Sequence, residues 1–136
     1  MSRHPLGLAA LIVCAAAVVA APVPKQLKKD ERAALIGEWE EPPEKKRMWW
    51  FKEDGTAGGG DLPEASRRGI FRIDASTTPK QLDWSTDNGK TWQLGLFTIE
   101  NDVLKVNMGK DTKAPRPANM EEVAETYSIT ATRKKN

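Results

Sequence analysis

The stretch 69–108, GIFRIDASTTPKQLDWSTDNGKTWQLGLFTIENDVLKVNM, decides the fold of this chain. In four successive runs, small or apolar residues alternate with polar ones, which is the period of half-buried β-strands. The runs cover residues 69–74, 81–85, 91–99 and 103–108. In the first run, Phe71 and Ile73 share one face and Arg72 lies on the other. The stretch therefore predicts four consecutive strands.

Turn residues connect these runs directly. Asn88-Gly89 lies between the second and third runs and supplies the positive backbone angles of a tight hairpin. Asn101-Asp102 joins the third and fourth runs and tolerates the same conformation. These connections leave no room for a helical crossover, so neighbouring strands must pair antiparallel.

Two strands with clear signals precede this stretch. The first is Leu35–Trp39, after a short helix that Asp30 can cap. Pro42-Pro43 ends it, because proline cannot donate to a sheet ladder. The second is Arg47–Lys52, and Asp54-Gly55 after it is a hairpin signal.

The remaining segments give weaker signals. A third strand begins at Thr56 and enters the triple glycine 58–60, where we expect a flexible or bulged edge. Asn119 and Glu122 have the spacing of a helix start, which predicts one turn of helix before the last strand, Thr126–Arg133.

Eight candidate strands at short spacing predict an all-β fold, a small antiparallel up-and-down β-barrel with a short N-terminal helix. We expect Trp39, Trp84 and Trp92 to point inward. The residues expected to line the lumen are Phe71, Ile73, Leu82, Trp84, Leu104, Val106, Tyr127 and Ile129.

The N-terminal residues have the layout of an export signal. Arg3 and His4 precede an apolar run that is rich in alanine and valine and ends in small residues. This predicts a signal peptide over residues 1–20 and an exported protein, periplasmic or extracellular. A membrane anchor and a lipoprotein signal at Cys14 are the alternatives; the apolar run is short for a bilayer span, and the residue before Cys14 is a bulky valine.

Cleavage of this signal would remove Cys14 and His4, the only cysteine and the only histidine. The mature chain would then lack thiol nucleophiles, imidazole bases and zinc sites of the Cys/His kind. Residues 21–29 would be a flexible tether, and residues 30–136 a single domain large enough to fold by core packing. We therefore predict no enzyme activity, no cofactor and no metal site.

Charge argues against a nucleic-acid partner. The chain has 21 Lys and Arg against 19 Asp and Glu, a net charge of +2. The basic residues fall mainly into three short runs, too few for the many phosphate contacts that nucleic-acid binding needs.

Carboxylate pairs such as Glu40 with Glu41, or Asp83 with Asp87, are expected to be solvated rim groups.

Gly37-Glu38-Trp39, on a first strand after a short helix, resembles the Gly-x-Trp signature of lipocalin-like barrels. In that family an arginine on the final strand packs over the tryptophan at the closed end, and Arg133 is the matching position. The resemblance implies a structural signature of Gly37, Trp39 and Arg133.

Six sequence blocks follow one another in order: LIGEW (35–39), GIFRID (69–74), PKQLD (79–83), GLFTI (95–99), DVLKV (102–106) and RP (116–117). Their order and spacing resemble a family of small secreted planctomycete proteins that are described as lipocalin-like. That family has no assigned activity, so the resemblance implies a fold and no chemistry.

Residues 85–92, STDNGKTW, are similar to the Asp-box pattern of sialidase-type propellers, Ser-x-Asp-x-Gly-x-Thr-Trp. A propeller needs several blades, and only one copy of the pattern occurs here. We interpret it as a hairpin in which Asp87 accepts turn amides, Gly89 takes a left-handed angle and Trp92 folds beneath.

Two functions are open to such a barrel. An eight-stranded barrel has an interior that side chains just fill or that holds one small ligand, so the first hypothesis is a small apolar or amphipathic ligand in the lumen. The second is an envelope module with a filled core that binds a partner protein through an outward aromatic patch of Met48 and Trp50. A lumen of roughly 300 Å³ or more would favour the ligand.

Overall fold

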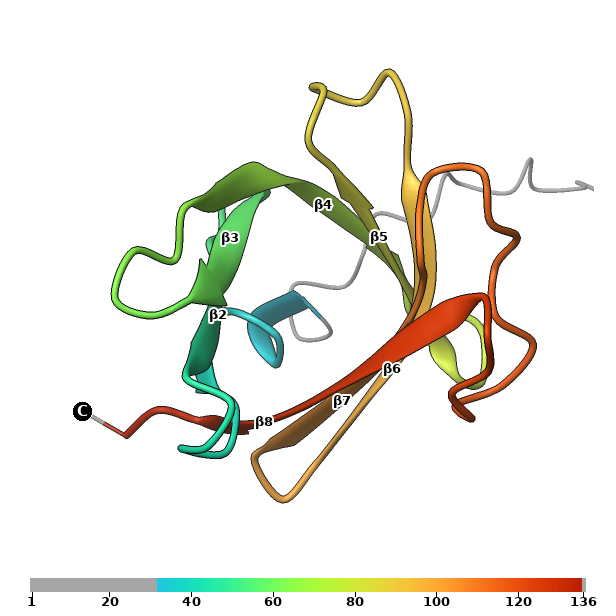
Figure 1. Ribbon diagram of the computed structural model, residues 1–136. Coiled ribbons are helices and arrows are strands. Elements are labelled where there is room, and N and C mark those ends of the chain that lie inside the picture. The colour runs from blue at the N-terminus through green and yellow to red at the C-terminus, as the bar shows by residue number, and fades with distance from the viewer. Residues whose placement is uncertain (1–31, 136) are drawn as a thin grey trace, which may run out of the picture.

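The computed structural model describes residues 32–135, which form a closed all-β barrel (Figure 1). The strands follow one another around the barrel in sequence order, each antiparallel to its neighbours. They are β1 (Gly37–Glu40), β2 (Arg47–Phe51), β3 (Thr56–Asp61), β4 (Arg67–Asp74), β5 (Lys80–Ser85), β6 (Gln93–Glu100), β7 (Val103–Gly109) and β8 (Thr126–Arg133). Because β8 pairs with β1, the predicted up-and-down barrel is confirmed.

Some of the predicted N-terminal features lie outside the described residues. These are the signal peptide 1–20, the tether 21–29 and the proposed helix cap Asp30. Of the short helix, Arg32 and Ala33 are helical and pass directly into a turn.

Residues 32–36 close one end of the barrel and lie within the ring of strands in Figure 1. Leu35 is completely buried there, and its carbonyl accepts a hydrogen bond of 2.9 Å from Trp39 Nε1. The Arg32 guanidinium lies 4.9 Å from the Phe71 ring centroid. This turn fills the space beneath the barrel core with side chains.

Arg133 fixes the same end from β8. Its guanidinium lies 4.2 Å from the ring centroid of Trp39, which is itself completely buried. It also donates hydrogen bonds to the carbonyls of Ala34 and Ile36. Gly37 has φ +132°, and a Cβ there would lie 3.0 Å from Arg133 Nη1. The three signature residues therefore meet at one closed end.

β3 is paired along both edges. Gly58 lies opposite Trp50 on β2 and opposite Arg68 on β4. A Cβ at Gly58 would lie 2.2 Å from Trp50 Cζ2, so glycine lets the indole lie flat on the sheet. The flexible or bulged edge expected at residues 58–60 is wrong, because β3 pairs with β2 over residues 57–61 and with β4 over residues 56–59. Close approach of the Trp50 ring explains the glycine at 58.

The loop between β5 and β6 is a hairpin built around Asp87. The Asp87 carboxylate accepts hydrogen bonds from the Ser85 hydroxyl at 2.8 Å and the Thr91 amide at 2.9 Å. Bonds from Thr91 and Ser85 lower the pKa of Asp87 to about 2. Gly89 has φ +88°, so the hairpin interpretation is confirmed. The predicted strand start at Thr91 is wrong: the Thr91 amide donates to the Asp87 carboxylate, and β6 starts at Gln93.

The segment 110–125 covers the outer face of the barrel instead of forming a helix. The Asn119 side chain accepts from the Glu121 amide and makes a turn, so the predicted helix start is wrong. The Asn107 side-chain amide donates 2.8 Å bonds to the carbonyls of both Asn119 and Glu121, which ties this segment to β7.

Arg116 anchors the same segment to β5. It donates hydrogen bonds of 2.6 and 3.1 Å to the Asp83 carboxylate and one of 2.8 Å to the Gly95 carbonyl. Arg72 donates a further bond of 2.9 Å to Asp83. Asp83 is therefore a buried, doubly paired carboxylate, and its interpretation as a solvated rim group is wrong.

Candidate functional site: an apolar pocket at the barrel mouth

The end of the barrel opposite the 32–36 turn is called the mouth here. It carries the loops 41–46, 62–66, 86–92 and 110–125. β1 leaves the sheet at Pro42, so only Trp39 and Glu40 pair with β8. Above these two pairs, β2 and β4 face β8 across an apolar pocket.

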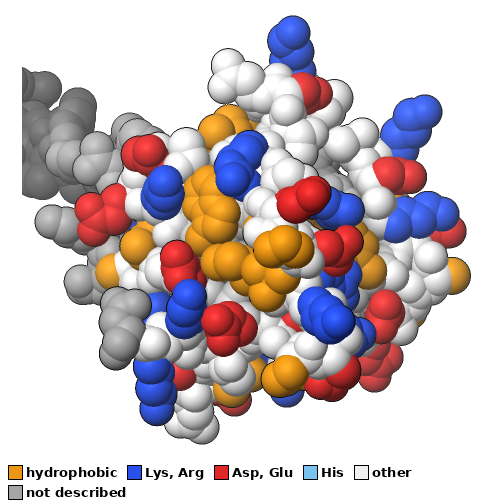
Figure 2. Space-filling view, turned by 60° about the vertical axis from the view of Figure 1, so that its left-hand side comes forward, with side chains coloured by type: hydrophobic (Ala, Val, Ile, Leu, Met, Phe, Trp, Pro, Cys, Tyr) orange, Lys and Arg blue, Asp and Glu red, His pale blue; other side chains and the backbone are white. Residues whose placement is uncertain are grey.

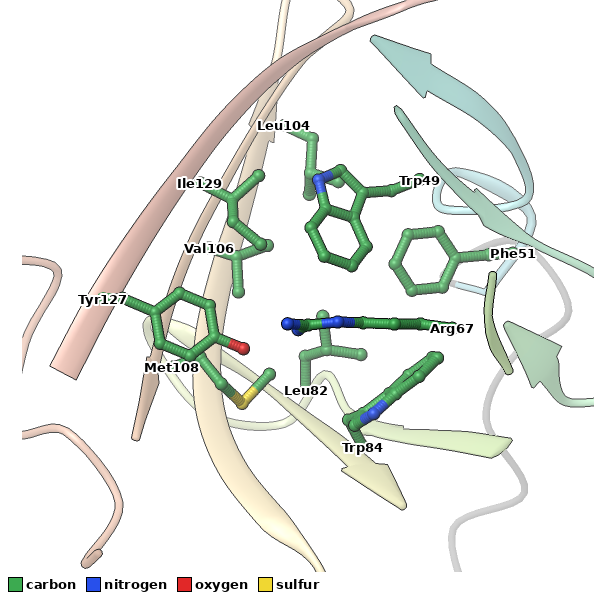
Figure 3. Close-up of a pocket in the computed structure, with 10 residues that line it drawn as sticks. All are labelled: Trp49, Phe51, Arg67, Leu82, Trp84, Leu104, Val106, Met108, Tyr127 and Ile129. Carbon is green, nitrogen blue, oxygen red and sulfur yellow. The ribbon is translucent and has the colours of Figure 1, made fainter. Parts of the chain in front are cut away.

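The pocket encloses a cavity of about 40 Å³. Its lining comes from strands β2, β4, β5, β7 and β8: Trp49, Phe51, Arg67, Leu82, Trp84, Leu104, Val106, Met108, Tyr127 and Ile129 (Figure 3). Six of the eight predicted lumen residues are in this lining. The other two, Phe71 and Ile73, lie in the packed core and do not reach the cavity.

Three aromatic side chains of the lining are only half buried. Trp49, Trp84 and Tyr127 point into the pocket from β2, β5 and β8 (Figure 3), yet each keeps part of its surface exposed. Side chains in the closed half are packed much more tightly: Trp39 and Phe97 are 0% and 1% exposed. The lower lumen is filled, and the mouth presents apolar aromatic surface to water.

Glu41 fixes Trp49 in this position. Its carboxylate accepts hydrogen bonds of 2.9 Å from Trp49 Nε1 and 3.2 Å from Arg47 Nη2, and it forms an ion pair with Arg47 in which Nε lies 2.9 Å from Glu41 Oε2. The Glu41 side chain is almost completely buried, so the expectation of a solvated rim carboxylate is wrong here too. Its charge is already neutralised by Arg47.

Tyr127 contributes a phenolic hydroxyl to the pocket lining. Burial raises the pKa of Tyr127, while the positive charge of Arg67 and a hydrogen bond to Gln93 partly offset that rise. The phenol therefore keeps its proton at neutral pH and can donate a hydrogen bond.

Trp92 lies outside the pocket, contrary to the expectation that it points inward. The Arg72 guanidinium stacks 4.0 Å from its ring centroid, and Arg72 projects from the outer face of β4. Trp92 therefore covers the outside of the barrel wall beside the Asp87 hairpin.

The predicted surface patch of Met48 and Trp50 lies on the outer face of β2, where both side chains are half buried. Lys52 Nζ and Arg68 Cζ lie 4.9 and 5.2 Å from the Trp50 ring centroid. Figure 2, which brings the β2–β3 side forward, shows apolar side chains near its centre with charged groups around them. Trp50 therefore sits in a groove bordered by cations.

Residues 32–135 contain neither a metal-binding cluster nor a helix that could span a membrane. No group of three or more His, Cys, Asp or Glu side chains there could hold a metal ion. No helix in this part of the chain has the length and apolar character to cross a bilayer.

Comparison of the chain with family models, curated proteins and solved structures finds no match. The fold and site define a closed eight-stranded barrel with an apolar pocket at its mouth. The resemblance to lipocalin-like proteins stays a prediction.

Sequence reasoning missed four of the lining residues. Trp49 and Phe51 share one face of β2, but Trp49 and Trp50 both lie opposite a glycine of β3, so nothing in the sequence distinguishes the inward face of this strand. Met108 lies two residues after Val106 on β7, so it continues the alternation of the predicted lumen residues Leu104 and Val106. Arg67 gave no signal, because β4 starts two residues before the apolar alternation begins at Gly69.

Proposed function

We propose that this chain is an exported, lipocalin-like binding module, not an enzyme, and that the mouth pocket takes a slender apolar group. The observation that carries the proposal is the half-buried aromatic surface of Trp49, Trp84 and Tyr127 around the cavity. A purely structural core would bury these rings, because exposed aromatic surface in a concave site forgoes favourable burial.

The size of the cavity limits what can enter. A volume of about 40 Å³ is far below the roughly 300 Å³ of pockets that enclose drug-sized ligands. Bulky cargo held wholly inside the lumen is therefore disfavoured. A single unbranched chain or one ring that enters tip first fits the proposal better.

Isothermal titration calorimetry of the purified protein with octan-1-ol, and separately with the bulky dye Nile red, tests this function. We expect octan-1-ol to bind with one site and Nile red to bind poorly. Val106→Phe, which places a ring in the cavity, should abolish octan-1-ol binding, provided that its melting temperature shows a folded protein. Lys105→Phe, which introduces the same ring at the exposed neighbouring position of β7, is the matched control and should bind octan-1-ol normally. Failure of octan-1-ol to bind the wild type would refute the proposal.

A second candidate is an envelope interaction module that uses the outer patch of Met48 and Trp50. The observation that favours it is the Trp50 ring between two cations in a surface groove. Because that ring also covers Gly58, Trp50→Ser is expected to lower stability as well as binding. The double variant Lys52→Ser, Arg68→Ser is therefore the better test. It should release any partner captured by the wild type while the pocket still binds octan-1-ol.

A further inference from the structure

Arg67 lies across the pocket from the first position of β4. Figure 3 shows its side chain extended over the cavity between Trp84 and Phe51, with the guanidinium on the side of Tyr127. Opposite it in β3 is Gly59, and a Cβ at Gly60 would lie 3.7 Å from Arg67 Cγ. The aliphatic stem therefore rests on a strand that has no side chains there.

The Arg67 guanidinium has neither an ion pair nor a hydrogen-bond acceptor within residues 32–135. Four other arginines of the barrel have carboxylate partners, and Arg68 donates to the backbone carbonyls of Ala65 and Arg67. Arg47 pairs with Glu41, Arg72 and Arg116 pair with Asp83, and Arg133 pairs with Asp102. Glu41, the buried carboxylate at the mouth, is already held by Arg47 and Trp49. The pocket therefore presents an uncompensated positive charge beside apolar surface.

We infer that the mouth pocket selects an amphipathic monoanion, whose headgroup binds the Arg67 guanidinium and whose slender apolar tail enters the cavity. The inference rests on the proposed pocket function and adds the chemical class of the ligand. A guanidinium binds carboxylate or sulfate oxygens with charge-assisted hydrogen bonds, which are stronger than neutral ones. The protonated hydroxyl of Tyr127 faces the same space and supplies a further donor.

Arg67 also closes the mouth in the absence of ligand. Its side chain is exposed, so it can swing toward solvent without breaking a salt bridge. This movement widens the entrance and keeps the guanidinium at the rim, where the headgroup of an inserted chain would sit. The small cavity volume and the preference for an anion therefore have the same cause, because Arg67 lies over the apolar pocket.

Calorimetry with matched eight-carbon probes at neutral pH tests the inference. The probes are octanoate, octyl sulfate, octan-1-ol and octyltrimethylammonium. We expect at least one anion to bind about tenfold or more tighter than the alcohol, a difference of about 1.4 kcal/mol, and the cation to bind most weakly. Whichever anion binds better identifies the headgroup. Equal affinities for the alcohol and both anions would overturn the inference and leave the apolar pocket standing. Absence of binding by every probe would overturn both.

Substitutions at two neighbouring arginines distinguish a direct contact between the guanidinium and the anion from an effect of the protein's net charge. Arg67→Met removes the guanidinium and keeps a slender side chain, so the affinity for the anion should fall to that for octan-1-ol, which should itself be unchanged. Arg68→Met makes the same charge change on the outer face of the same strand and should keep the anion preference. An equal loss in both variants would assign the preference to net charge and overturn the inference. Melting curves verify that each variant is folded.

Discussion

Arg133→Met should unfold the barrel at markedly lower denaturant concentration than the wild type. The substitution removes the guanidinium over Trp39 and leaves the carbonyls of Ala34 and Ile36 without their donor. The cation–π contact contributes about 1 kcal/mol. Each hydrogen bond from a charged donor contributes about 1.5 kcal/mol. The Arg133 side chain is 29% exposed, so solvent reduces the total to about 3 kcal/mol.

Urea unfolding followed by tryptophan fluorescence measures this change in the free energy of unfolding. Lys134→Met is the matched control, because it removes the adjacent positive charge. Lys134 makes only exposed ion pairs, 3.5 Å from Glu38 and 4.0 Å from Glu40, so its loss should cost less than about 1 kcal/mol. If Arg133→Met costs no more than Lys134→Met, the argument that Arg133 holds the closed end is wrong.

Two further predictions concern the outer face and the β5–β6 hairpin. Arg116→Met leaves the buried Asp83 carboxylate with one partner fewer and should destabilise the protein by about 3 kcal/mol in the same urea assay. Lys110→Met, which breaks an exposed pair, should have little effect. The pKa of Asp87 is lowered from 3.8 to about 2, so its bonds to the hairpin add stability above about pH 4 that is lost as the pH falls toward 2. Melting temperatures measured across this range should therefore fall less steeply for Asp87→Asn, and an unchanged slope would contradict the role given to its bonds with Thr91.

Local sequence signals were enough to predict the barrel. Alternation of apolar and polar residues, together with turn pairs such as Asn101-Asp102, acts over a few residues and needs no knowledge of distant contacts. Asn101 and Asp102 indeed take φ of +53° and +59°. The predictions at Thr91 and Asn119 were wrong for one physical reason. In both places a side-chain oxygen, of Asp87 or of Asn119, accepts a hydrogen bond from a nearby backbone amide.

The pocket was harder to predict because it depends on contacts between distant segments. Trp92 looked like a core residue because no sequence signal indicates that Arg72 covers it on the outside. The volume of the lumen depends on how side chains from five strands pack together, and the alternation of apolar and polar residues along each strand does not predict that packing. Arg67 is a candidate because it lies across the cavity and has no partner within residues 32–135, and both properties depend on segments far from it in the sequence.

The closed end also fixes how the molecule can be attached to something else. Arg32 enters the barrel beside Phe71, and Lys134 leaves it where its amide donates to the Glu38 carbonyl, so both ends of the described chain emerge at the sealed base. A tag, a sensor surface or a carrier domain joined directly before Arg32 or after Lys134 would therefore attach at the sealed base, with the aromatic opening at the far end of the barrel facing the surrounding solution.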